Sequence, residues 1–238
     1  MASRAICERV LSTGADVIDV VDVPTEQTTA ATDAILALLA LAGLVVLVRL
    51  RSRDSRKARI WGAALGCLAV ASTLGAVAHG VQTSEGLKHG LWLGIYLSLG
   101  LLVAWFVVGT VYDLWGARAA SRIAPVMTLI GVAFVALTQL IDGAFVVFVI
   151  YEAVALSFAF IGYAYLALGK RLKGAGIVAA GILVTLAAAA IQATRPGALI
   201  TVVWTFDHNG LFHLVQMAGV VLIVLGLRTA MLCRPAIG

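Results

Sequence analysis

The stretch Leu36-Ala-Leu-Leu-Ala-Leu-Ala-Gly-Leu-Val-Val-Leu-Val48 decides the fold class, because it is continuously apolar. A membrane β-strand alternates apolar and polar residues over about ten positions, so this uninterrupted run favours a helix. Outward from it, the apolar character extends over residues 32–50, with Asp33 in the first turn. A helix needs about 20 residues to cross the hydrocarbon core of a bilayer. The stretch therefore predicts a transmembrane helix.

Six further apolar runs of similar length follow, and 62% of the 238 residues are hydrophobic while 12% are charged. In soluble domains about a quarter of the residues are charged. The sequence thus predicts an all-α integral membrane bundle of seven transmembrane helices over residues 29–238, after a polar, acidic segment at residues 1–28. The six further spans are predicted at residues 60–80, 91–116, 125–141, 144–168, 176–193 and 210–227.

Basic residues predict the orientation of the bundle. Of the 17 Lys and Arg residues, 13 follow the first, third, fifth and seventh spans. Cytoplasmic loops are enriched in Lys and Arg, so we expect the N-terminus outside and the C-terminus in the cytoplasm. Trp61 and Trp115 fall at predicted inner ends, and Trp92 and Trp204 near outer ends, as in an aromatic belt. A composition rich in Ala, Gly, Val and Arg indicates a bacterial inner membrane.

Charge and cysteine content exclude several other classes of protein. The net charge of +5 comes from basic residues in short loops beside apolar segments, which argues against nucleic acid as a partner. Cys7, Cys67 and Cys233 are predicted to lie too far apart for a disulfide. A retinal protein is excluded because the lysines are all predicted in loops, where none can form a Schiff base. These lysines are Lys57, Lys88, Lys170 and Lys173.

All four histidines fall at the predicted outer end of the bundle. His79 ends the second span, His89 precedes the third, and His208 and His213 lie at the start of the seventh, beside Asp207. Imidazole is a common ligand of zinc, iron, copper and nickel, and three histidines with one open position are typical of catalytic zinc. His79, His89, His208 and His213 are therefore predicted metal ligands, with zinc as the expected ion. The alternative is that each histidine simply tolerates the membrane interface.

The spacing at the seventh span complicates this prediction. His208 and His213 are five residues apart, or about 140° around a helix, so they cannot share one face if both are helical. Asp207 or Asn209 is a natural N-cap, which would leave the His208 ring free to turn inward. Alternatively, Asn209 and His213 face the same way and His208 supports them.

Seven spans, with a histidine ending the second and a histidine pair opening the seventh, resemble the CREST superfamily. This superfamily includes the alkaline ceramidase and adiponectin/progestin-receptor-type membrane proteins. Its pattern has Ser-x3-His in the second helix, where His79 matches the histidine and Gly75 stands at the serine position. Ser72 lies one turn deeper, and His89 stands roughly where the family has an aspartate near the third helix.

In the seventh helix the family has His-x3-His, of which His213 matches the second histidine. Asn209 occupies the first position, with His208 displaced by one residue. The resemblance extends to the topology of the whole bundle, but it rests on few residues. It implies a zinc-dependent hydrolase that cleaves an amide or ester of a lipid-like substrate.

Two acidic residues inside the predicted spans need an explanation. Glu152 lies about two turns into the fifth span, where a carboxyl group is costly and by default a functional candidate. Its alternative role is a structural acid hydrogen-bonded to Gln139, Gln192 or Gln216. Asp113, near the inner end of the third span, is predicted to be an interfacial anchor.

The sequence thus predicts an intramembrane hydrolase with its site near the extracytoplasmic surface. Asp207, His89 or Glu152 is the expected proton acceptor, and Ser72 is expected to orient or polarise the substrate. Membrane lipids and a lipid-like substrate are the expected partners. Two other functions stay open: a non-catalytic receptor or sensor, and a haem-binding electron carrier with two histidines as axial ligands.

Overall fold

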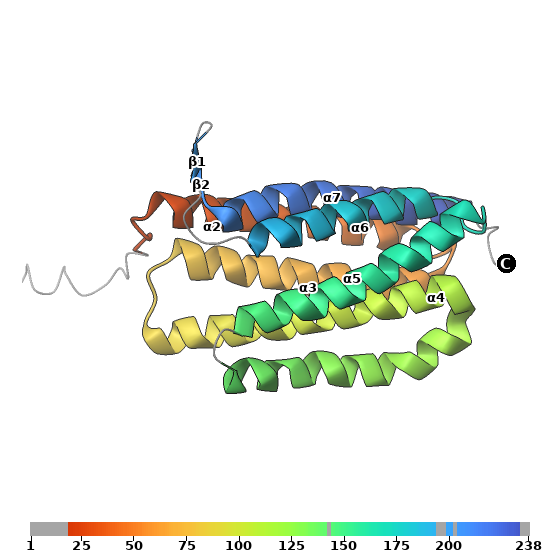
Figure 1. The fold of residues 1–238 in the computed structure, drawn as a ribbon, viewed down its shortest axis with the longest axis horizontal. Helices are drawn as coiled ribbons and strands as arrows, with labels where there is room; N and C mark the ends of the chain where they lie inside the picture. The colour runs from red at the N-terminus through yellow and green to blue at the C-terminus, as the bar shows by residue number, and fades with distance from the viewer. Residues whose placement is uncertain (1–18, 142–143, 194–198, 202–203, 234–238) are drawn as a thin grey trace, which may run out of the picture.

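Most of the residues that the computed structural model describes are helical (Figure 1); these residues are 19–141, 144–193, 199–201 and 204–233. Six helices in these ranges are long and apolar enough to cross a membrane. This confirms an all-α fold whose helices suit a membrane by length and composition. The helices are α2 (Pro24–Arg49), α3 (Ser55–Gly80), α4 (Glu85–Leu140), α5 (Ala144–Leu168), α6 (Ala175–Gln192) and α7 (His208–Leu232). Before α7, β1 (Ile200–Thr201) and β2 (Thr205–Phe206) pair antiparallel.

Helix α4 is interrupted at Gly116, whose φ of 84° lies in the region that favours glycine. At this point the helix folds back on itself (Figure 1). Residues 85–115 form a first limb and residues 117–140 a second limb, at the positions of the predicted spans 91–116 and 125–141. The limbs approach closely where Gly100 faces Gly131, because a Cβ atom on Gly131 would lie 2.7 Å from the Gly100 carbonyl oxygen.

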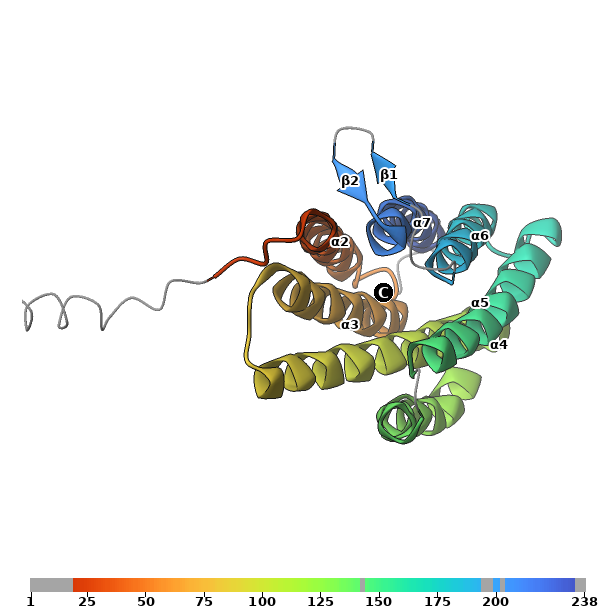
Figure 2. The ribbon, with the colours of Figure 1, turned by 60° about the vertical axis from the view of Figure 1, so that its left-hand side comes forward.

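The helices close into a ring in which consecutive helices pack side by side and α7 returns to α2. The second limb of α4 lies outside this ring, against the first limb and α5 (Figure 2). Phe134 on the second limb stacks on Tyr151 of α5 and contacts Phe148 edge-on. The interior of the ring is therefore formed by α2, α3, the first limb of α4, α5, α6 and α7.

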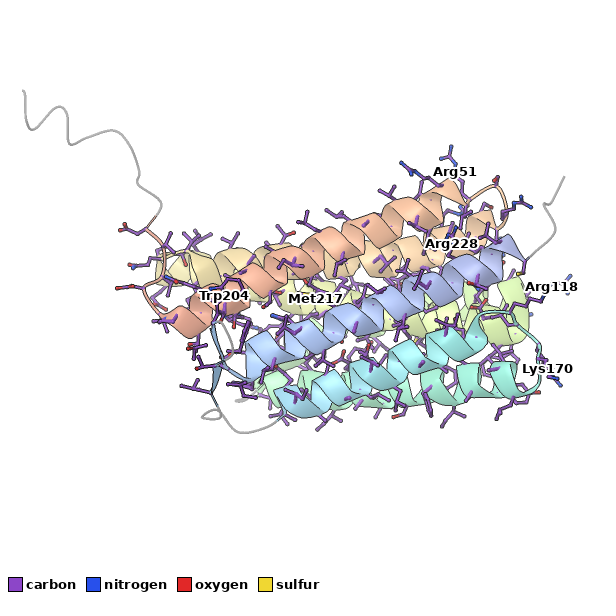
Figure 3. The ribbon with its side chains drawn as sticks, turned by 90° about the horizontal axis from the view of Figure 1, so that it is seen from above. Arg51, Arg118, Lys170, Trp204, Met217 and Arg228 are labelled. Carbon is purple, nitrogen blue, oxygen red and sulfur yellow. The ribbon has the colours of Figure 1, made fainter. Side chains whose placement is uncertain are left out.

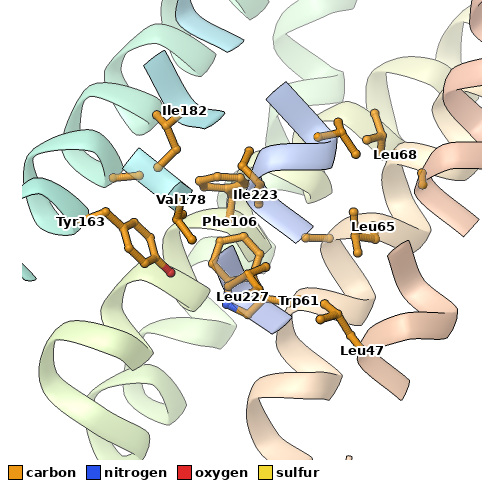
Figure 4. Packing of buried hydrophobic residues seen from close by; sticks show 14 of the residues in the cluster. Leu47, Trp61, Leu65, Leu68, Phe106, Tyr163, Val178, Ile182, Ile223 and Leu227 are labelled. Carbon is orange, nitrogen blue, oxygen red and sulfur yellow. The ribbon is translucent and has the colours of Figure 1, made fainter. Parts of the chain in front are cut away.

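A large cluster of buried hydrophobic residues extends toward the end of the bundle where α2 ends and α3 begins (Figure 4). Trp61 is 1% exposed and meets Phe106 edge-on, with ring centroids 4.8 Å apart, and Tyr163 lies next to it. The prediction that Trp61 belongs to an aromatic belt at the membrane surface is wrong. Helix α3 begins at Ser55 rather than residue 60, which places Trp61 two turns inside the bundle.

Two lysines predicted in loops lie in helices, because α3 and α4 both begin earlier than predicted. Lys57 lies in the first turn of α3, and Lys88 lies in the first turn of α4. Lys57 is buried, and its ammonium group lies 2.8 Å from both carboxylate oxygens of Asp113. Asp113 is therefore half of a buried ion pair rather than an interfacial anchor.

Helices α6 and α7 pack through glycines, as is common for helices in lipid. A Cβ atom on Gly219 would lie 2.6 Å from the Thr185 hydroxyl, and one on Gly226 would lie 2.6 Å from a Val178 methyl group. A Cβ atom on Gly181 would lie 2.8 Å from the Gly219 carbonyl oxygen. We call this contact the glycine seam.

The two ends of the bundle differ in charge, as the loops predict. Arg51, Arg118, Lys170 and Arg228 lie at one end, and Trp204 lies at the other (Figure 3). We call these the basic end and the histidine end, since His79, His208 and His213 lie where α3 ends and α7 begins.

Candidate functional site

A cavity of about 580 Å³ opens between the helices in the half of the bundle nearer the histidine end. Five of the predicted site residues line it: Ser72, His79, Glu152, His208 and His213. They come from α3, α5 and α7, so the fold brings together residues that are far apart in the sequence. The remaining walls are mostly apolar, and include Leu36, Leu68, Ile95, Leu99, Leu102, Phe148 and Phe212.

His213 is held by two neighbouring residues of α2. Its Nε2 lies 3.4 Å from Oδ1 of Asp33, and its Nδ1 lies 3.1 Å from the Thr32 hydroxyl oxygen. That hydroxyl has two backbone carbonyls as acceptors, those of Thr28 and Thr29. When the hydroxyl donates to one of these carbonyls, Nδ1 of His213 donates to the hydroxyl oxygen, and the contact between Nε2 and Asp33 then needs a proton on one of those two groups.

Sequence reasoning placed Asp33 in the first turn of a span but missed its role. Helix α2 begins at Pro24, about two turns before residue 32, so Asp33 lies inside the bundle and is 5% exposed. Gly75 faces it on α3, because a Cβ atom there would lie 2.5 Å from Oδ2 of Asp33. The Asp33 carboxyl group thus occupies the space next to the position where the CREST pattern has a serine. The sequence did contain a signal for this role, because a carboxylate inside an apolar run needs a partner.

His79 is held by a second acid that sequence reasoning did not single out. Its Nδ1 lies 2.6 Å from Oε2 of Glu26, and the edge of its ring meets Trp92 with centroids 5.7 Å apart. His79 and Trp92 also line a second hollow of about 410 Å³, which is open to the histidine end and includes Gln82 and Lys88. These two side chains therefore stand between the cavity and the outer hollow.

Glu152 is 7% exposed and lines the cavity from α5. Among the residues that the structure describes, no hydrogen bond reaches its carboxyl group. The amide of Gln192 donates to Asn209, and Gln139 donates to Thr138, so neither serves Glu152. Gln216 lies in the same wall, and its Oε1 is also buried without a partner in the described chain. Glu152 is therefore not a structural acid hydrogen-bonded to one of these glutamines.

Two predicted site residues lie outside the cavity. Asp207 is the N-cap of α7, where its Oδ1 accepts from the backbone N–H of Gly210 at 2.9 Å and from the Thr29 hydroxyl at 3.3 Å. The carboxylate is satisfied by this cap, which confirms the capping prediction and leaves His208 as the first residue of the helix. His89 is exposed in the second turn of α4.

The donors as placed do not form a metal site. Across the described ranges, no group of three or more His, Cys, Asp or Glu side chains is arranged to hold a metal ion. Nδ1 of His79 contacts Glu26, and both ring nitrogens of His213 contact residues of α2. Nδ1 of His208 is buried without a partner among the described residues, so this nitrogen is available to a ligand. Zinc ligation stays a prediction.

Comparison with known proteins gives a family but no activity. The family described as "Family of unknown function (DUF6962)" matches residues 28–232. This interval includes every residue that lines the cavity. No curated protein and no solved structure matches the chain.

Proposed function

The chain belongs to the DUF6962 family, and we propose that this member is a membrane hydrolase that cleaves an amide or ester bond of a lipid-like molecule. In this proposal the bundle crosses the membrane seven times, because the two limbs of α4 count as separate spans. The basic end faces the cytoplasm of a bacterial cell, following the enrichment of Lys and Arg in cytoplasmic loops. The cavity then lies in the outer half of the inner membrane.

One observation carries the proposal: a mostly apolar cavity contains both a His–Asp pair and the carboxyl group of Glu152, which has no hydrogen-bond partner in the described part of the chain. Its volume of about 580 Å³ is in the range of small-molecule sites. Apolar walls suit an acyl chain, while Asp33, His213 and Ser72 gather at the polar part. A helix interface that served only packing would not retain the ionisable side chains of Asp33, Glu152 and His213 inside a membrane.

The chemistry follows from where protons can reside. In its carboxylate form, Asp33 beside His213 can accept a proton from water as that water attacks the carbonyl carbon. Glu152, buried without a counter-charge, is most stable in its neutral form and can give its proton to the leaving nitrogen or oxygen. The Ser72 hydroxyl lines the same cavity and can donate to the carbonyl oxygen as negative charge develops there.

Zinc, which the CREST resemblance implies, would supply an activated water when bound. Binding at His79, His208 and His213 would require His79 to leave Glu26 and His213 to leave Asp33 and Thr32. The residues as placed do not fit that ion, so the steps above use this chain's own groups.

The test uses purified full-length protein and a panel of N-acyl amides and acyl esters, with released fatty acid measured by mass spectrometry. Asp33→Asn and Glu152→Gln are each expected to lower the rate at least about 100-fold, since general acid–base groups contribute about 10²–10⁴. Asp22→Asn changes an exposed acid outside the cavity and serves as the control. Elemental analysis of the same samples tests zinc. Activity that survives both cavity substitutions overturns the proposal.

A receptor or sensor is favoured by a different observation. Both His79 and His213 are engaged with acids on α2, so a ligand that separates these pairs could move α2 without any bond being broken. Binding of a panel lipid without product, weakened by Glu152→Gln, would select this function.

A further inference from the structure

A separate hollow of about 340 Å³ lies at the basic end, on the outside of the ring, between α3 and α4. Arg56, Arg59 and Ser121 form its polar side, and Trp105, Val108 and Ala124 are among its apolar residues. Ser121 and Ala124 belong to the second limb of α4. The turn at Gly116 thus brings that limb beside α3 to make the second wall.

Neither arginine forms an ion pair with a carboxylate among the residues that the structure describes. Arg56 and Arg59 are both exposed and, being three residues apart in a helix, lie on the same side of α3. The two buried acids nearby are engaged elsewhere: Asp113 is paired with Lys57, and Asp54 accepts hydrogen bonds from the backbone N–H of Lys57 and the hydroxyl of Tyr112. Arg56 instead donates through Nη1 to the Ser121 hydroxyl oxygen at 3.5 Å, which leaves that hydroxyl hydrogen free for an acceptor.

The apolar residues of the hollow indicate which class of anion it would bind. Trp105 is half-buried, and Val108 and Ala124 continue the surface toward the middle of the bundle. The hollow therefore has positive charge at the level of the membrane surface and apolar side chains at the depth of the acyl chains. A soluble anion would use only the charged half. Basic pockets between transmembrane helices at the cytoplasmic side are known to receive lipid phosphates.

We propose that this hollow binds an anionic phospholipid from the leaflet at the basic end of the bundle. The phosphate accepts hydrogen bonds from Arg56, Arg59 and the Ser121 hydroxyl, and an acyl chain lies along Trp105 and Ala124. The lipid bridges α3 and the second limb of α4, and so stabilises the limb that lies outside the ring. This inference does not depend on the proposed hydrolase.

The experiment is native mass spectrometry of the detergent-purified full-length protein, titrated with phosphatidylglycerol or with phosphatidylcholine of the same acyl chains. Wild type is expected to retain one phosphatidylglycerol preferentially. Arg56→Gln with Arg59→Gln is expected to weaken that first binding step about 30-fold, from the contribution of two arginines near a membrane surface. The matched control, Arg51→Gln with Arg228→Gln, removes the same charge from the basic end away from the hollow and is expected to change binding less than about twofold.

A third variant, Ser121→Leu, fills the hollow without removing charge and is expected to weaken binding in the same direction. Equal binding of the two lipids overturns the proposal, as does an equal loss in the control double variant. Competition by inorganic phosphate or glycerol phosphate at the concentration of the lipid would assign the hollow to a soluble anion and would also overturn it.

Discussion

Replacing Lys57 alone is expected to destabilise the protein more than replacing Lys57 and Asp113 together. The ammonium group lies 2.8 Å from both carboxylate oxygens, and the two side chains are 1% and 0% exposed. Removing one partner leaves a buried charge without compensation, which costs about 3–5 kcal/mol. Lys57→Met and Asp113→Asn should each fall in this range.

The double variant removes both charges and retains an oxygen at position 113. Tyr163 now donates to Asp113 at 2.6 Å, and the asparagine oxygen can accept the same hydrogen bond. The remaining cost is that of an imperfectly paired amide, about 1–3 kcal/mol. The double variant is therefore expected to cost less than the sum of the single variants by at least about 2 kcal/mol.

The assay is equilibrium unfolding in mixed micelles, with increasing SDS and far-UV circular dichroism as the signal. Tyr163→Phe, which removes one hydrogen bond and leaves both charges, is the control and is expected to cost about 1 kcal/mol. Additive single and double variants would refute the reasoning, because they would mean that the two groups do not compensate each other's burial.

Three other substitutions test the site and the packing. Gly75→Ser should displace Asp33, because its Cβ would lie 2.5 Å from the carboxylate, and a hydrolysis assay should show at least a tenfold loss of rate. Glu152→Leu removes a buried carboxyl group that has no partner in the described chain. It should raise the unfolding free energy by about 1 kcal/mol or more in the SDS assay and abolish turnover. A fall in stability would contradict the view that this carboxyl group is unpaired. Gly219→Val should lower the unfolding free energy by about 1–3 kcal/mol through the clash across the glycine seam, whereas Gly66→Ala, whose Cβ meets nothing within 4 Å, should not lower it.

The helical membrane fold could be predicted because the length of an apolar run is a strong and local signal. The starts of α2 and α3 could not, for a physical reason. Asp33 and Lys57 read as polar ends of spans when taken alone, yet both are buried because partners on other helices compensate them. Those partners, His213 and Asp113, are far away in the sequence.

In the candidate site, too, some residues could be predicted from the sequence and others could not. His79, His213 and Glu152 stood out because each is a polar residue in apolar surroundings, and the structure places all three around one cavity. Glu26 did not stand out, because it lies in an acidic segment where it is one carboxylate among several. Asp207 was singled out by its neighbours, but the same sequence position also suits a helix cap, and the structure uses it there.

The glycine seam also restricts how a molecule can reach the cavity from within the bilayer. Backbone atoms of α6 and α7 are nearly in contact along this seam, so the two helices cannot separate without losing their most intimate packing. Helix α5 packs against each of its neighbours, and α2 packs against α7, less extensively than α6 packs against α7. Because α5 also carries Glu152, a lateral entrance for an acyl chain should open beside it.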